Sequence, residues 1–154
     1  MPAHAEIERR LALLPTIGCA VDVLPDDLFS FYFQAIVARY KLQSSGQEFG
    51  FSQECMVQRH DISSLEQNDV QRLLFSLTSE AESIVVVIWA NDHTGSMMKY
   101  SCFAEYFDDL WYPSSDDVWV VDPAFLWLIE VDHEEILSCY RKPKVGMLGT
   151  AHVE

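Results

Sequence analysis

The residues of this chain best suited to binding chemistry form an acidic and aromatic segment between Tyr100 and Tyr140. It holds ten acidic side chains and ten aromatic rings, and it contains no lysine or arginine. Aromatic rings offer contact area, and carboxylates without a neighbouring cation attract positive groups. The densest part runs from Phe107 to Trp119 and reads FDDLWYPSSDDVW. It predicts a surface that binds a positive partner, unless its rings belong to the core.

Six residues in this densest part are the candidate partner-binding residues: Asp108, Asp109, Trp111, Tyr112, Asp116 and Asp117. The carboxylates could pair with a guanidinium group, which also stacks on aromatic rings. In the alternative interpretation the tryptophans are core and the acids belong to caps and turns. Trp119 and Trp127 alternate with apolar residues on expected strands, which predicts core positions for both. For Trp111 and Tyr112 surface and core both stay open.

No pattern in the chain predicts a particular reaction. An EF-hand needs alternating acids, a glycine and a terminal glutamate, and the segment 108–117 has no such glycine. The run Asp132-His133-Glu134-Glu135 holds metal-compatible donors, but adjacent helical positions do not share a face. We therefore predict no catalytic residue, no metal site and no cofactor. A metal-assisted hydrolase that uses the acidic cluster with His133 stays open as an alternative function.

The bulk composition restricts the class of partner. Ten basic residues against 24 acidic ones give a formal net charge of −14. This charge opposes binding to nucleic acid and to anionic membranes, and it favours basic proteins. The N-terminus lacks an apolar signal core, and the apolar run 84–90 is too short to cross a bilayer, which predicts a cytoplasmic protein. The four cysteines lie far apart in sequence, and we expect them to be buried thiols rather than disulfides.

Hydrophobic periodicity predicts an α+β fold. Helices are expected over 5–14 and 25–42 and again after Gln67, and strands over 49–57, 83–90, 97–103, 118–121 and 126–131. The segment 136–140 fits a strand or a helix, and Asp132 with Glu135 as a capping pair slightly favours the helix. The prediction is a single domain over 1–141 with a mostly antiparallel sheet of about five strands and two to four helices. Residues 142–154 are expected to form a flexible tail.

The motif FDDLWYPSSDDVW and the later run WLIEVDHEE, over 127–135, resemble motifs of small uncharacterised bacterial proteins. In style these proteins resemble the immunity proteins of polymorphic and contact-dependent toxin systems, which are short, acidic α+β proteins without catalytic signatures. The resemblance covers about the last third of the chain. It implies a non-enzymatic cytoplasmic protein that neutralises a basic toxin. A homodimerising structural or regulatory module is a further alternative.

Overall fold

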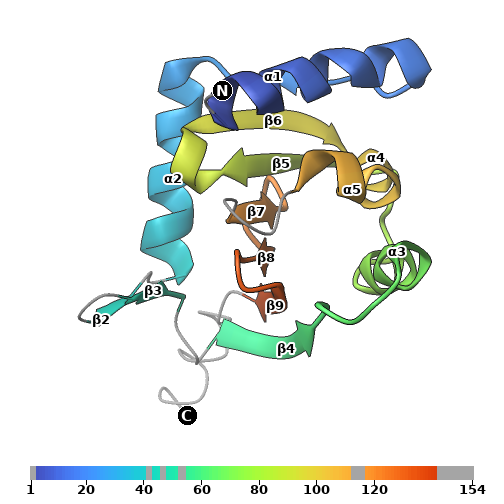
Figure 1. Cartoon of the computed structure of the whole chain (residues 1–154). Coiled ribbons are helices and arrows are strands. Elements are labelled where there is room, and N and C mark those ends of the chain that lie inside the picture. The colour runs from blue at the N-terminus through green and yellow to red at the C-terminus, as the bar shows by residue number, and fades with distance from the viewer. Residues whose placement is uncertain (1–2, 41–42, 46–47, 52–54, 112–116, 142–154) are drawn as a thin grey trace.

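The computed structural model describes residues 3–40, 43–45, 48–51, 55–111 and 117–141. Within them, an antiparallel seven-stranded sheet has the strand order β1-β6-β5-β7-β8-β9-β4 (Figure 1). Its strands are β1 (Asp22–Val23), β4 (Met56–Asp61), β5 (Ile84–Trp89), β6 (Thr94–Lys99), β7 (Val118–Val121), β8 (Trp127–Val131) and β9 (Ile136–Arg141). A separate ladder joins β2 (Gln43–Ser45) to β3 (Glu48–Gly50). The α+β class is confirmed, with more strands than the five expected.

Helices cover both faces of this sheet. They are α1 (Ala3–Leu13), α2 (Asp26–Tyr40), α3 (Gln67–Ser76), α4 (Tyr100–Glu105) and α5 (Phe107–Leu110), together with the 3-10 turns η1 (Leu14–Ile17) and η3 (Ala90–Asp92). Figure 1 shows α2 alone along one side, with α1, α3, α4 and α5 around the other. Among the described residues, no helix has the length and hydrophobicity that crossing a bilayer requires.

The strands alternate side chains between two separate cores. Val85, Val87 and Trp89 of β5 pack with the buried faces of α1, α3, α4 and α5. Val86 and Ile88 pack on the other face with α2. Since both faces of β5 are buried, its continuous apolar sequence reflects a central strand, as predicted. Two-sided burial also explains why so many rings of the acidic segment enter the core.

The strand predicted over 97–103 is wrong in its second half. β6 ends at Lys99, and α4 begins at Tyr100. The backbone N–H groups of Tyr100 and Ser101 donate to the carbonyls of Ser83 and Ala81, at 2.9 and 2.7 Å, and hold the start of the helix against the loop before β5. A short apolar run has the same composition in a buried strand and in a buried helix, so periodicity alone did not separate them.

The helix slightly favoured over 136–140 is also wrong, because this segment is strand β9. The Asp132 carboxylate accepts hydrogen bonds from the backbone N–H groups of Glu134 and Ile136, at 2.9 and 3.0 Å. Glu135 has a φ of 65°, which a right-handed helix does not allow. The acidic run therefore closes a tight turn between β8 and β9 instead of capping a helix.

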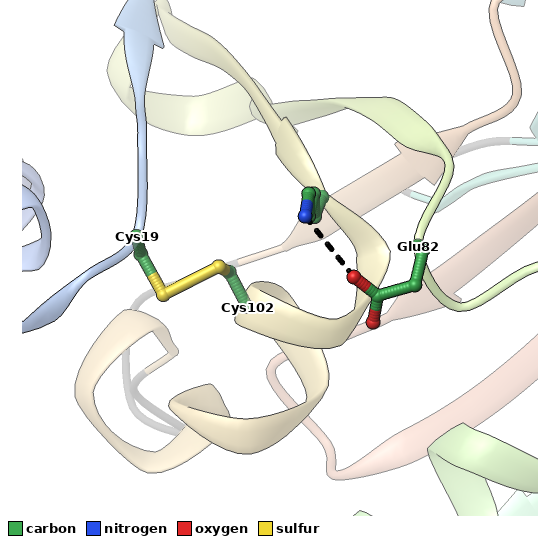
Figure 2. The surroundings of a disulfide bond; sticks show 4 residues. Cys19, Glu82 and Cys102 are labelled. Carbon is green, nitrogen blue, oxygen red and sulfur yellow. Dashed lines mark hydrogen bonds and ion pairs between the residues drawn. A yellow bond between two sulfur atoms is a disulfide. The ribbon is translucent and has the colours of Figure 1, made fainter.

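The cysteines differ from the expectation of four thiols. Cys19, which follows η1, forms a disulfide with Cys102 of α4, and their Cα atoms are 6.0 Å apart (Figure 2). Cys55 and Cys139 are buried and not disulfide-bonded, as expected. The two bonded residues are 83 positions apart, so their spacing in the sequence held no sign of the pairing. Packing of α1 and η1 against the α4 side of the sheet brings them together.

Candidate functional site

The predicted partner-binding residues divide between several neighbourhoods. Asp108 and Asp109 lie on α5, and Trp111 follows directly after it. Asp117 lies immediately before β7. Tyr112 and Asp116 lie outside the described residues. The described members of the set therefore lie on different elements, and each has to be considered with its own contacts.

Trp111 belongs mainly to the core. Its side chain is 8% exposed, and its ring stacks on Phe107 at a centroid distance of 5.1 Å. Its indole N–H is buried, and among the described residues it has no hydrogen-bond partner. Buried indole N–H groups usually have a partner, and an unsatisfied donor costs about 1–3 kcal/mol. The sequence left surface and core open for Trp111, and the structure shows a core position. The buried indole N–H without a partner is a second feature of this residue.

The two adjacent acids on α5 have different surroundings. Arg10 of α1 donates from Nη1 to the main-chain oxygen of Asp109 at 3.1 Å and to its Oδ1 at 3.4 Å. Asp108 instead lines a groove on the other side of α5. Partial burial, and then the charge of Asp109, raises the pKa of Asp108. Within the same short helix, one carboxylate therefore already pairs with an arginine and the other lies in a groove.

That groove has a volume of about 340 Å³, which lies within the roughly 300–1,000 Å³ typical of ligand pockets. We call it the α3–α5 groove. It is lined by Ile62, Ser63, Leu65, Gln67, Val70, Phe107, Asp108, Trp111 and Glu135. Its polar lining includes two carboxylates, and no lysine, arginine or histidine is among these lining residues. Most of the lining could not be predicted from the sequence, because it comes from three segments far apart in the chain.

Main-chain and side-chain contacts hold these segments together. The Ile62 N–H donates to the Glu135 carbonyl at 2.9 Å, which joins the loop before α3 to the turn between β8 and β9. The buried Tyr100 hydroxyl donates to the Leu74 carbonyl at 2.6 Å, tying α3 to α4. Trp89 of β5 donates from its indole N–H to the Leu110 carbonyl at 2.7 Å and fixes the end of α5. The groove is therefore built on the packed core.

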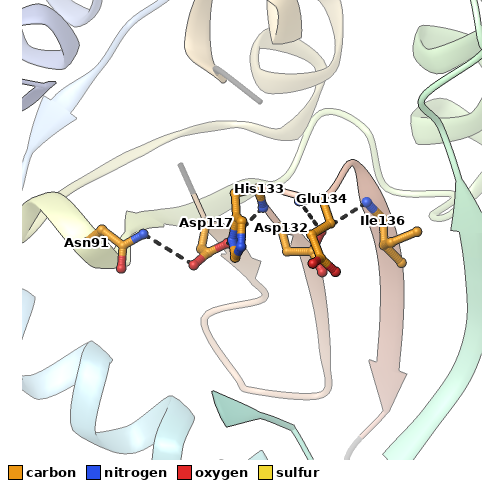
Figure 3. Close-up of polar contacts among 6 residues, drawn as sticks. All are labelled: Asn91, Asp117, Asp132, His133, Glu134 and Ile136. Carbon is orange, nitrogen blue, oxygen red and sulfur yellow. Dashed lines mark hydrogen bonds and ion pairs between the residues drawn. The ribbon is translucent and has the colours of Figure 1, made fainter. Parts of the chain in front are cut away.

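Asp117 is the centre of a separate group of polar contacts, at the end of the sheet near the turn 132–135. Its carboxylate accepts from the His133 N–H at 2.9 Å, from Asn91 Nδ2 at 3.2 Å, and it contacts His133 Nδ1 at 3.0 Å (Figure 3). The hydrogen bond to Asp117 raises the pKa of His133. The turn 132–135 thus contributes His133 to this group of contacts and Glu135 to the α3–α5 groove. A carboxylate with three contacts of this kind orders a loop.

The structure does bring His133 next to an acid, as the hydrolase alternative requires. Across the described parts of the chain, however, no group of three or more histidine, cysteine, aspartate or glutamate side chains is arranged to hold a metal ion. Glu130, between Trp119 and Ser138 in the cross-strand register, is the most perturbed acid nearby. Burial, followed by the charges of Asp132 and Asp117, raises its pKa to about 8. The hydrolase remains an untested alternative.

Comparison with known proteins adds no family to this description. No protein-family model matches the chain, and neither the curated proteins nor the solved structures searched give a match. The case for a function therefore depends on the residues and their geometry.

Proposed function

We propose that the protein is a non-enzymatic binding protein for a basic protein partner, acting as an immunity protein acts on a toxin. The observation that carries this proposal is the α3–α5 groove, in which Asp108 and Glu135 lie among apolar walls without a lining cation. A net charge of −14 would accelerate the encounter with a basic partner. Apolar walls and acids together would then supply contact area and charge pairing.

The proposal extends to location. The cytoplasm is the expected compartment, and disulfides are rare there because thiols are kept reduced. A cytoplasmic role therefore requires Cys19 and Cys102 to be thiols in the cell, although they can pair in the fold. Alkylation of protein taken directly from its host, followed by mass spectrometry of the peptides with Cys19 and Cys102, tests this part. Two unmodified, bonded cysteines would place the protein in an oxidising compartment instead.

Affinity capture from the native host at low salt tests the main proposal. We expect a basic protein that binds the purified chain directly, with an affinity that falls as salt screens the charges. A large secreted toxin encoded beside this gene would support the immunity role. If no basic protein binds at low salt, or if the recovered partner is acidic and its binding does not respond to salt, the proposal is wrong.

A homodimerising module is a second candidate, favoured by an apolar surface on α2. Leu28 and Phe31 lie one helical turn apart and are 42% and 56% exposed. Asp26 and Asp27 lie at the same end of this helix. Because each copy carries −14, self-association has to overcome like-charge repulsion. Light scattering over a range of concentrations and salt distinguishes the two: a mass that stays monomeric in high salt excludes the homodimer.

A further inference from the structure

The α3–α5 groove combines three properties that point to one kind of occupant. Its walls include Leu65 and Val70, which suit the methylene groups of a long side chain. Its carboxylates, Asp108 and Glu135, suit a cationic end group. Trp111 also lines the groove, and its indole N–H is a buried donor without a partner among the described residues. Acid alone would indicate only a solvated surface, whereas the three together describe a site for an extended cationic side chain.

We propose that the α3–α5 groove binds an arginine side chain of the basic partner, with Asp108 and Glu135 as the acceptors of its guanidinium group. This inference rests on the proposed function and specifies the part of the partner that is recognised. Arginine fits better than lysine because its planar guanidinium presents several donors at fixed angles and can bridge two carboxylates. A peptide carbonyl beside the arginine is the acceptor that the Trp111 N–H lacks, reached by the side-chain adjustment common at interfaces.

The contact between Arg10 and Asp109 shows how α5 already binds an arginine. There the guanidinium uses a carboxylate oxygen and a main-chain oxygen of the same residue. Asp108, the residue before Asp109 on α5, lines the groove, whose lining has no basic side chain. Partial burial and the charge of Asp109 make ionised Asp108 costly, which its raised pKa reflects. A cation in the groove favours the ionised form of Asp108 and offsets the charge of Asp109.

Titration of the intact protein with Nα-acetyl-argininamide, followed by proton–nitrogen NMR of the tryptophan indole groups, tests this site directly. Trp111→Phe identifies the indole signal of Trp111 by its disappearance. We expect millimolar binding that moves this signal, weaker binding of Nα-acetyl-lysinamide, and no binding of the neutral isostere Nα-acetyl-citrullinamide. An unmoved Trp111 signal, or equal shifts with the citrulline probe, would overturn the proposal.

Two variants with the same charge change separate the groove from the overall field. Asp108→Asn should weaken binding of the arginine probe about five- to tenfold, because a charge-assisted pair is lost. Asp26→Asn removes another exposed acid, from α2 across the sheet, and should change binding less than about twofold. If the two variants weaken binding equally, the groove is not the site.

These outcomes distinguish the inference from the proposed function. A basic partner captured from the host that binds Asp108→Asn as tightly as the unaltered protein leaves the proposed function intact and removes the groove from it. Absence of any basic partner, together with probe binding at Trp111, would mean that the groove accepts arginine without serving an immunity role. Because Asp108 is exposed, Asp108→Asn should fold. The binding test with this variant therefore stays valid even if Trp111→Phe fails to fold.

Discussion

Replacing Glu130 by glutamine should abolish most of the loss of stability that the unaltered protein undergoes as the pH rises from about 4.5 to about 8. Glu130 lies on β8 between Trp119 of β7 and Ser138 of β9, each 4% exposed. Burial is the main cause that raises its pKa from 4.5 to about 8, and the nearby charges of Asp132 and Asp117 add to it. The folded protein therefore keeps a proton that the unfolded chain has released.

The sign and size of the effect follow from this difference in proton binding. Between pH 4.5 and about 8 the unfolded state binds fewer protons at this site, so the free energy of unfolding falls as the pH rises. Each unit between the two pKa values corresponds to about 1.4 kcal/mol, which gives an upper limit of about 5 kcal/mol. Since Glu130 retains some contact with solvent, we expect a measured difference of about 2–4 kcal/mol.

Urea unfolding followed by tryptophan fluorescence measures this difference. Near pH 4.5 the unaltered protein and Glu130→Gln should agree within about 1 kcal/mol, and near pH 9 the variant should be the more stable. His133, whose raised pKa also makes stability fall with rising pH, is present in both proteins and cancels in the comparison. Glu80→Gln makes the same chemical change at an exposed position away from His133 and serves as the control. If the free energies of unfolding of the unaltered protein and Glu130→Gln change in parallel with pH, the reasoning is refuted.

Three further changes test other parts of the structure. Asp117→Asn weakens the contacts to His133 and should cost about 1–2 kcal/mol of unfolding free energy. The pairing with Asp117 raises the pKa of His133, so it stabilises the protein at pH values below the ordinary histidine pKa, and this stabilisation is lost as the pH rises. The cost of the substitution should therefore be larger near pH 6 than near pH 9. A cost that does not depend on pH would contradict the pairing. Replacing both Cys19 and Cys102 by alanine should lower the free energy of unfolding by about 4 kcal/mol, because a bond between residues 83 positions apart restricts the unfolded chain. Urea unfolding checks this, and four reactive thiols in the unreduced, denatured protein would show that the bond is absent. Trp89→Phe removes the donor to the Leu110 carbonyl and should cost about 1–3 kcal/mol in thermal or urea unfolding, whereas an unchanged midpoint would mean that water replaces the indole.

The elements with a strong period were predictable from the sequence. The second helix was expected over 25–42 and is α2, and the buried run 83–90 is β5. The hairpin of β7 and β8 was also expected, and its two strands pair in antiparallel register. In each case local composition and tertiary burial favour the same structure, so the local pattern was sufficient.

The errors lie where tertiary contacts decide between two local possibilities. The run after Lys99 is apolar enough for a strand, and hydrogen bonds to the loop before β5 select the helix α4. The acids before Ile136 resemble a capping box, and the side chain of Asp132 uses its acceptors to close a turn instead. The two-residue edge strand β1 has no period to detect.

The candidate site was predictable only in part, for a similar reason. Asp108 and Trp111 were identified by their density of charge and rings, and both line the α3–α5 groove. Leu65 and Glu135 line it as well, yet only the folded sheet and its loops bring them to α5. Asp117 was grouped with Asp108 on sequence proximity, although its contacts are with Asn91 and His133. Closeness in the sequence therefore did not predict which residues have contacts in common.

The bond between Cys19 and Cys102 also determines how the chain behaves under mechanical load. It closes a covalent ring between residues 83 positions apart in a chain of 154, and α2 and β5 lie within this ring. An unfolding motor that pulls from one end can extend only the residues outside the ring, and it then meets a double thickness of polypeptide. Degradation or passage through a narrow pore would therefore stall at this point until a reductant opens the ring, so the lifetime of the oxidised protein would follow the thiol chemistry of its surroundings.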